Sequence, residues 1–376
     1  MLNFPPAVAE NQPENKYRMN DQLSAFGARL RDAISSGFRN QNFDSLALEL
    51  FALQFEKNSV YQIFCKAQKF TPQIVEHWTP IPFAPTGAFK EWELTSLAPD
   101  ERTAVFHSSG TTEQKPSRHF HCAESLELYE ASLWNWFAKS IFDSRFTIHD
   151  SRPVFLTPPP AQAPHSSLVY MFETVRQKLG APESVFVGRI DTDGAWTLDI
   201  DAASAALNNS TLNSQPSTLL LGTAFSFVHL LDFLAEKNLR LNLPAGSRVM
   251  DTGGYKNRSR SLPKAELHSL IAEFLGVPRE NIICEYGMSE LSSQAYAISA
   301  GKFQFPPWAR AQIISPETGR EVADGETGLI RVFDLANVFS VAAIQTEDLG
   351  IRHGDGFELI GRAEFAKPRG CSLMTA

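Results

Sequence analysis

A run of small residues after a predicted strand at 103–107 is the first feature that could do chemistry. It consists of Ser108, Ser109, Gly110, Thr111 and Thr112. Small side chains let backbone N–H groups approach an oxyanion, and the hydroxyl groups add donors, so the run could bind phosphate. It does not match the P-loop pattern GxxxxGK(S/T). An ordinary Ser/Thr-rich surface loop explains the composition equally well.

Two glycines with an aromatic and a basic residue follow a second predicted strand, at 247–251. They are Gly253, Gly254, Tyr255 and Lys256. The glycines would admit a flat ring against the backbone, and Tyr255 could stack on that ring. Lys256 could supply positive charge to a transition state. The alternatives are a tight turn, which Gly-Gly forms readily, and a solvated surface lysine.

The third motif completes a predicted strand at 281–286. It consists of Tyr286, Gly287, Met288, Ser289 and Glu290. Active sites of open α/β sheets gather at the carboxyl ends of parallel strands. Glu290 offers the hard oxygen ligand that Mg²⁺ prefers beside a phosphate. An ordinary exposed glutamate is the alternative.

Two charged residues flank a predicted hairpin turn at 353–356 near the end of the sequence. Asp348 could accept hydrogen bonds from ribose hydroxyls. Arg362 could bridge phosphate and sugar oxygens with its fork of donors. A hairpin that carries only surface charges is the alternative.

Composition limits the classes of protein that these motifs could serve. The chain has 376 residues, 43% of them apolar, and a net charge of −8. A normal apolar fraction argues against disorder, and an acidic chain without a long basic block argues against nucleic-acid binding. The N-terminal sequence shows no secretory signal. The longest apolar stretch, 218–234, is interrupted by His229 and Asp232, so we expect a buried helix and no membrane span.

The cysteines favour a reduced, cytoplasmic protein because they lie far apart and form no CxxC pair. The HxHC stretch at 119–122 resembles metal-ligand spacing only superficially, since no second cluster accompanies it. We expect Cys65, Cys122 and Cys284 to be buried apolar residues.

Alternating strands and helices predict an α/β fold with parallel strands. We expect helices within 21–69 and at 123–142, 218–236 and 263–275. The predicted organisation is a helical and irregular region packed on the core, an α/β core, a β-rich subdomain and a C-terminal tail. These four parts are predicted at 1–100, 101–304, 305–362 and 363–376.

In this order, the motifs resemble those of the acyl-adenylate-forming superfamily. The resemblance implies the large N-terminal domain of such enzymes, ATP and Mg²⁺ as cofactors, and the nucleotide roles given above. It also implies that His165 lines a carboxylate pocket. Glu113 and the order Lys115–Pro116 depart from the usual loop. Typical members continue after the arginine into a mobile lid with a catalytic lysine, which we do not expect here.

The tail places Cys371 after Lys367 and Arg369. Nearby cations lower the pKa of a thiol and increase its nucleophilic thiolate form. With the adenylate motifs, this tail resembles that of LuxE-type acyl-protein synthetases. That resemblance implies activation of a fatty acid, self-acylation at Cys371 and transfer to an acyl reductase, with Glu290 and Arg362 as further catalytic residues. It leaves a homo-oligomer open.

Two other functions fit the same residues. A phenylacetate-type acyl-CoA ligase would use CoA as its acceptor. A non-catalytic acyl- or nucleotide-binding subunit of a reductase complex would explain the unusual Glu113.

Overall fold

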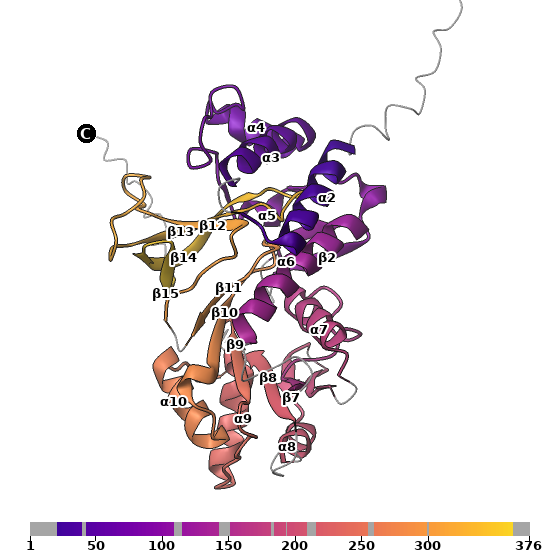
Figure 1. Cartoon of the computed structure of the whole chain (residues 1–376), viewed down its shortest axis with the longest axis vertical. Coiled ribbons are helices and arrows are strands. Elements are labelled where there is room, and N and C mark those ends of the chain that lie inside the picture. The colour runs from indigo at the N-terminus through magenta and orange to yellow at the C-terminus, as the bar shows by residue number, and fades with distance from the viewer. Residues whose placement is uncertain are drawn as a thin grey trace, which may run out of the picture.

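Two β-sheets with helices packed on them form the framework of the computed structural model (Figure 1). One sheet is mostly parallel and lies between layers of helices, and the other is mostly antiparallel. This arrangement confirms the predicted α/β class with a smaller β-rich part. The structure describes residues 21–39, 43–108, 115–142, 151–181, 184–192, 194–208, 216–254, 259–298 and 301–363.

The larger sheet has the strand order β11-β10-β9-β8-β4-β5. Its strands are β4 (Ser151–Phe155), β5 (Val185–Phe186), β8 (Ser217–Thr223), β9 (Arg248–Thr252), β10 (Ile282–Tyr286) and β11 (Ala295–Ile298). Every pair is parallel except β10 with β11. The central strands β4, β8, β9 and β10 are buried along nearly their whole length because both faces of a parallel sheet are covered.

Helices cover both faces of this sheet. They are α6 (Ala123–Ile141), α7 (Ser167–Leu179), α8 (Ile200–Asn208), α9 (Ala224–Glu236) and α10 (Lys264–Leu275). Successive residues of a strand point to opposite faces. Accordingly, Leu219 belongs to the apolar cluster that includes Phe137 of α6 and Phe172 of α7, while Leu220 belongs to the one that includes Phe227 of α9 and Ile271 of α10.

The prediction of one helix over 218–236 was wrong in its first part. Residues 217–223 form strand β8, and α9 begins at Ala224. An apolar run of this length suits a strand buried on both faces as well as a helix. Thr223 marks the change, since its hydroxyl accepts a hydrogen bond from the backbone of Ser226 at 3.3 Å and caps the new helix.

The smaller sheet combines distant parts of the chain. Its strands are β1 (Ala84–Pro85), β12 (Ala309–Ile314), β13 (Thr327–Asp334), β14 (Ala343–His353) and β15 (Gly356–Arg362). β14 pairs antiparallel with β13 and β15 and parallel with β1. The predicted turn at 353–356 is confirmed, because His353 pairs with Gly356.

Three N-terminal helices pack against this smaller sheet through a shared apolar core. They are α2 (Asp21–Ser36), α3 (Phe43–Lys57) and α4 (Ser59–Ala67). Gln54 of α3, which is buried, donates to the backbone carbonyls of Asn337 at 2.7 Å and Val338 at 3.1 Å. Its own carbonyl accepts from the backbone of Ala342 at 3.0 Å. One side chain therefore fixes α3 to the loop before β14.

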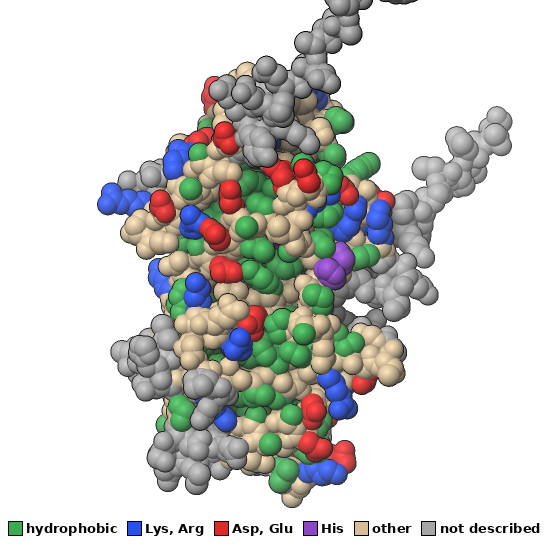
Figure 2. All heavy atoms as spheres, turned by 90° about the vertical axis from the view of Figure 1, so that its right-hand side faces the viewer, with side chains coloured by type: hydrophobic (Ala, Val, Ile, Leu, Met, Phe, Trp, Pro, Cys, Tyr) green, Lys and Arg blue, Asp and Glu red, His purple; other side chains and the backbone are tan. Residues whose placement is uncertain are grey.

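Short elements connect these layers. They are α5 (Ala88–Glu91), η2 (Pro99–Glu101), η4 (Arg279–Asn281), the hairpin of β2 (Ala104–His107) and β3 (Arg118–His121), and the hairpin of β6 (Gly188–Ile190) and β7 (Trp196–Leu198). On the face shown in Figure 2, acidic and basic side chains are interspersed among apolar ones. Within the described residues, every helix is too short or too polar to cross a bilayer.

Candidate functional site

The second and third motifs lie next to each other at the carboxyl end of the larger sheet. β9 and β10 are parallel neighbours in which Thr252 pairs with Glu285, so the residues that follow them meet at one edge. Gly253 has a φ of +64°, a conformation that favours glycine. Gly253 and Gly254 are exposed, and a Cβ on either would meet open space among the described atoms. An open backbone surface of this kind suits a flat ring. Tyr255 and Lys256 lie outside the described residues.

The β2–β3 hairpin brings the first motif to the third. Ser108 directly follows β2, and its hydroxyl accepts a hydrogen bond from the backbone of Ser117 at 2.9 Å. The hydroxyls of Ser117 and Ser289 lie 3.4 Å apart. Ser117 therefore connects Ser108, at the start of the first motif, to Ser289 of the third. Its residues Ser109, Gly110, Thr111 and Thr112, together with Glu113, lie outside the described residues.

Glu290 is buried, not an ordinary exposed glutamate. Its side chain accepts a hydrogen bond from the Ser289 hydroxyl at 3.0 Å, and its backbone carbonyl accepts one from Asn337 at 2.8 Å. His119 Nδ1 lies 2.8 Å from the backbone carbonyl of Ser289. Burial lowers the pKa of His119 to about 4, so the neutral ring can donate to this carbonyl. Residues 289–290 are thus fixed by hydrogen bonds to the β2–β3 hairpin and to the loop between β13 and β14 of the smaller sheet.

Glu285 and Thr252 join the two strands below this edge. The Thr252 hydroxyl donates to Glu285, whose pKa is raised to about 7 by burial. A Cβ at position 287 would overlap Glu285 Oε1. Gly287 therefore leaves room for the Glu285 carboxylate and does not have an unusual φ.

A hydrogen bond from Tyr286 to Asp348 links the larger sheet to the smaller one. The phenol donates to Asp348 Oδ2 at 2.9 Å, and Arg362 Nε lies 3.6 Å from Asp348 Oδ1. Asp348 and Arg362 are direct partners in the β14–β15 pairing. Burial raises the pKa of Asp348, whereas Arg362 is mostly exposed. The ring of Tyr286 packs against Phe303, Phe305 and Phe357.

His165 lies at the base of the β2–β3 hairpin. Its side chain is exposed, its ring centroid is 4.8 Å from that of His107, and its Nδ1 is 3.2 Å from the Val105 carbonyl oxygen. It lies beside β2, the strand that precedes Ser108, and forms no hydrogen bond to any of the other predicted site residues that the structure describes. Its role in a carboxylate pocket stays a prediction.

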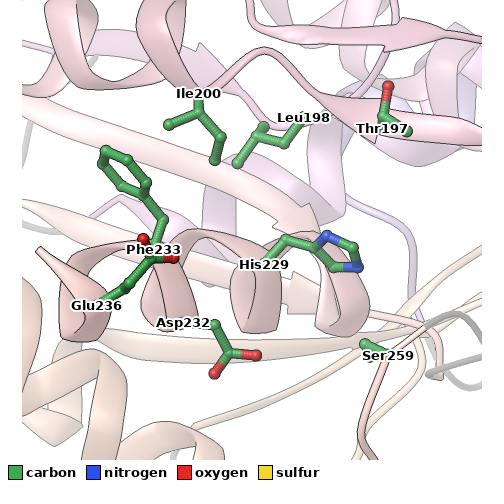
Figure 3. Close-up of a pocket in the computed structure, with 8 residues that line it drawn as sticks. All are labelled: Thr197, Leu198, Ile200, His229, Asp232, Phe233, Glu236 and Ser259. Atoms are coloured by element: carbon green, nitrogen blue, oxygen red, sulfur yellow. The ribbon is translucent and has the colours of Figure 1, made fainter.

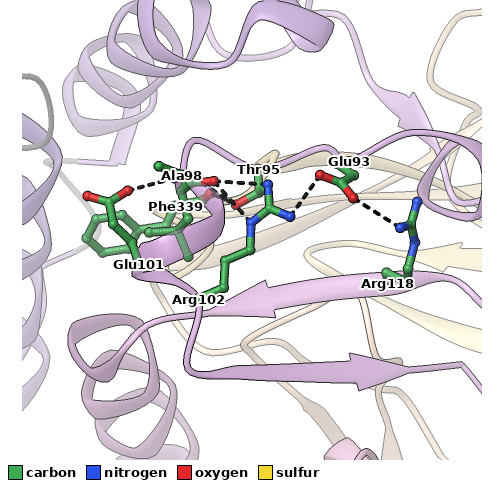
Figure 4. A network of polar contacts seen from close by, with 8 residues as sticks. Glu93, Thr95, Ala98, Glu101, Arg102, Arg118 and Phe339 are labelled. Carbon is green, nitrogen blue, oxygen red and sulfur yellow. Dashed lines mark hydrogen bonds and ion pairs between the residues drawn. The ribbon is translucent and has the colours of Figure 1, made fainter. Parts of the chain in front are cut away.

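A charged network fixes the same hairpin from outside (Figure 4). Glu93 accepts from Arg102 at 2.8 Å and from Arg118 at 3.1 Å. The hydrogen bond from Arg102 is the main reason that the pKa of Glu93 is lowered. The guanidinium of Arg102 also lies 4.3 Å from the ring centroid of Phe120, at cation–π distance.

Sequence reasoning missed the residues that hold the motifs. Asp334 accepts hydrogen bonds from the backbones of Ser292 and Ser293 at 2.9 and 2.8 Å, just after Glu290. The one sequence signal for this role was that Asp334 is a carboxylate at the buried end of strand β13. Ser117, His119 and Thr252 act in the same supporting way. Nothing in the sequence around Ser117 and Thr252 marks them, and His119 stood out only through its HxHC spacing, which did not indicate this role.

A separate cavity of about 450 Å³ lies between α9 and β7 (Figure 3). His229 and Asp232 project from α9 on one side of it, and Leu198 and Ile200 lie across from them. None of the motif residues that the structure describes lines this cavity. It is therefore distinct from the candidate site at the sheet edge.

A family model described as "Acyl-protein synthetase, LuxE" matches residues 31–376. The chain belongs to the LuxE family. This LuxE chain is 26% identical over 348 residues to the long-chain-fatty-acid–luciferin-component ligase of Aliivibrio fischeri, covering 89% of this chain and 87% of that protein. It is 25% identical over 334 residues to the ligase of the same name from Vibrio harveyi, covering 86% and 84%.

The predicted family and enzyme class are confirmed, since the LuxE relatives are acid–thiol ligases. Solved structures give the same fold. A 2-hydroxyisobutyryl-CoA ligase in complex with 2-HIB-AMP and CoA superposes with a TM-score of 0.61 at 13% identity, covering 98% of this chain and 82% of that one. The post-adenylation state of that ligase with R3-HIB-AMP gives 0.62 at 13%, covering 97% and 74%. The LuxE chain therefore has the fold of adenylate-forming enzymes.

Proposed function

We propose that this LuxE chain uses ATP to convert a fatty acid into acyl-AMP and then transfers the acyl group to its own Cys371. A partner acyl reductase would receive the acyl group from this thioester. The observation that carries the proposal is the 2.9 Å hydrogen bond from Tyr286 to Asp348. This hydrogen bond joins the third motif, at the end of β10, to Asp348, the predicted ribose-binding carboxylate. A nucleotide site formed by both sheets needs these two parts to be in contact.

The reaction balances in two steps. A carboxylate oxygen of the fatty acid attacks the α-phosphorus of ATP, and pyrophosphate leaves. The Cys371 thiolate then attacks the acyl carbonyl carbon, the bond to AMP breaks, and the thiol proton has gone to solvent. In this scheme the backbone of Gly253 and Gly254 faces the adenine ring. Asp348 accepts hydrogen bonds from the ribose hydroxyls, and Arg362 contacts phosphate and sugar oxygens.

The residues around Glu290 fit a hard divalent cation. Glu290 supplies a carboxylate, and the hydroxyls of Ser289 and Ser117 are close by. Oxygen ligands of this type suit Mg²⁺, which would neutralise charge on the phosphates when bound. We include Mg²⁺ with ATP in the proposal on this ground.

Cys371 lies outside the described residues, so the acceptor role needs a chemical test. Wild-type protein incubated with labelled fatty acid, ATP and Mg²⁺ should retain label that hydroxylamine removes. Cys371→Ser should retain none, while fatty-acid-dependent exchange of pyrophosphate into ATP continues. Cys122→Ser, a matched thiol deletion at a half-buried position, should behave as wild type.

Each other result points elsewhere. Label that remains on Cys371→Ser would remove the acceptor assignment. CoA-dependent AMP release that is equal in both proteins would favour an acyl-CoA ligase. Absence of pyrophosphate exchange in wild type would favour a non-catalytic binding subunit.

A further inference from the structure

Three potential metal ligands meet between the larger sheet and α10, on the strands that lead into the second and third motifs. They are Asp251 of β9, Cys284 of β10 and His268 of α10, which we call the Asp251 cluster. All three side chains are buried, none more than 2% exposed. Within the described part of the chain, this is the one group of three or more His, Cys, Asp or Glu residues whose ligand atoms lie within 4.8 Å of one another.

The ligand atoms of the Asp251 cluster converge on one point. His268 Nε2 lies 2.9 Å from Asp251 Oδ1, Cys284 Sγ lies 3.3 Å from the same oxygen, and Sγ and Nε2 are 3.5 Å apart. Zinc bonds of 2.0–2.3 Å in a tetrahedral arrangement place such atoms roughly 3.3–3.6 Å apart. The triangle thus has nearly the size of one face of a zinc tetrahedron, with the His268 to Asp251 edge somewhat short.

We propose that the Asp251 cluster is a binding site for Zn²⁺ or a chemically similar divalent transition ion. The donor set of one sulfur, one imidazole nitrogen and one carboxylate oxygen suits zinc and disfavours Mg²⁺ or Ca²⁺, which take oxygen ligands. This site is separate from the magnesium position proposed at Glu290. On binding, the Cys284 thiol releases its proton to solvent, and His268 coordinates through Nε2 with its proton on Nδ1.

Lys264 supports this assignment although it is a cation. Its ammonium contacts Asp251 Oδ2, which leaves Oδ1 as the oxygen that faces Cys284 and His268. Carboxylates that bind metals commonly accept a hydrogen bond on their other oxygen. The thiolate and the carboxylate balance the charge of the ion. The Lys264 side chain is 32% exposed, so solvent stabilises its charge.

The ion would link α10, through His268, to strands β9 and β10, through Asp251 and Cys284. Asp251 immediately precedes Thr252, which bonds to Glu285, and lies two residues before Gly253. The bound ion would therefore stabilise the sheet edge on which the proposed nucleotide site is built. Its binding does not depend on the proposed acyl transfer, so the two proposals can fail separately.

Cobalt substitution tests the site directly. Full-length protein treated with chelator and titrated with Co²⁺ should bind one equivalent with a thiolate-to-cobalt charge-transfer band in the near ultraviolet. Cys284→Ser and His268→Gln should lose the band. Cys65→Ser removes another fully buried thiol, and Cys371→Ser removes the proposed acyl acceptor; both should keep it. No band in wild type, or an undiminished band in Cys284→Ser, would overturn the proposal.

A second measurement uses wild type alone, in case the variants fold poorly. Zn²⁺ at a hundredfold excess over its Kd should raise the midpoint of thermal unfolding by roughly 3 °C. An equal concentration of Mg²⁺, without ATP, should not. Equal effects of the two ions, or no effect of Zn²⁺, would mean that the three side chains form a hydrogen-bonded cluster only.

Discussion

The Asp348 carboxylate has one partner in each sheet, Tyr286 and Arg362, and in the proposed function it also holds the ribose. Asp348→Ala should raise the KM for ATP roughly ten- to hundredfold, since charge-assisted hydrogen bonds contribute about 1.5–3 kcal/mol. The KM for ATP is measured from the rate of pyrophosphate exchange at varied ATP concentration. Asp355→Ala in the turn of the same hairpin is the control and should leave the KM unchanged. A KM within twofold of wild type for Asp348→Ala would remove the ribose role.

The Asp334 carboxylate should make stability depend on pH. Burial raises its pKa from 3.8 to about 6, so the native state favours the protonated form. A raised native pKa contributes stability below the unfolded pKa that is lost as pH rises through about 6. Asp334→Asn has no such titration. Relative to wild type, it should therefore gain on the order of 3 kcal/mol between pH 4 and pH 7.

Urea unfolding of both proteins across this pH range measures that difference. Asp100→Asn, at an exposed position, serves as the control and should track wild type. A constant difference between Asp334→Asn and wild type at all pH values would show that the carboxylate keeps the same charge in both states.

Among the elements, α3 depends on Gln54 for its attachment to the smaller sheet. Gln54→Ala removes the Nε2 amide, whose two N–H groups are shared among the carbonyls of Asn337, Val338 and Ser340, and leaves buried backbone groups unsatisfied. We expect a loss of roughly 2–3 kcal/mol in the free energy of unfolding. Urea denaturation measures it, with the exposed Gln68→Ala as control. A loss equal to that of the control would mean that apolar packing alone fixes α3.

The elements that carry the motifs were predictable because each is a short apolar run followed by small or charged residues. Strands β2, β9 and β10 lie within one or two residues of their predicted positions. β8 was missed, because Leu219, Leu220 and Leu221 fit a buried strand and a buried helix alike. β1 was missed because two residues in a proline-rich stretch carry no periodicity. The partners Thr252 and Glu285 were missed because strand order is a property of the whole sheet.

At the scale of the molecule, the proposed nucleotide site joins two sheets, so ATP should stabilise both together. ATP at a hundredfold excess over its Kd contributes about 2.7 kcal/mol, which for a chain of 376 residues raises the unfolding midpoint by roughly 3 °C. Differential scanning fluorimetry measures the shift. Asp348→Ala at the same ATP concentration should shift less, and inorganic phosphate should not reproduce the effect. Equal shifts in the two proteins would place ATP elsewhere.

The attachment of α3 also has a consequence for synthesis. Gln54 and Ala342 are 288 positions apart in the sequence. Strand β1 likewise pairs with β14, which is synthesised much later. On the ribosome, the N-terminal helices therefore emerge long before the strands that receive them. Phe43 and Phe51, buried in the finished protein, lack those partners through most of translation. Nascent chains that expose apolar side chains aggregate readily. The yield of folded enzyme will therefore depend on how well chaperones shield these N-terminal helices until β13 and β14 are made.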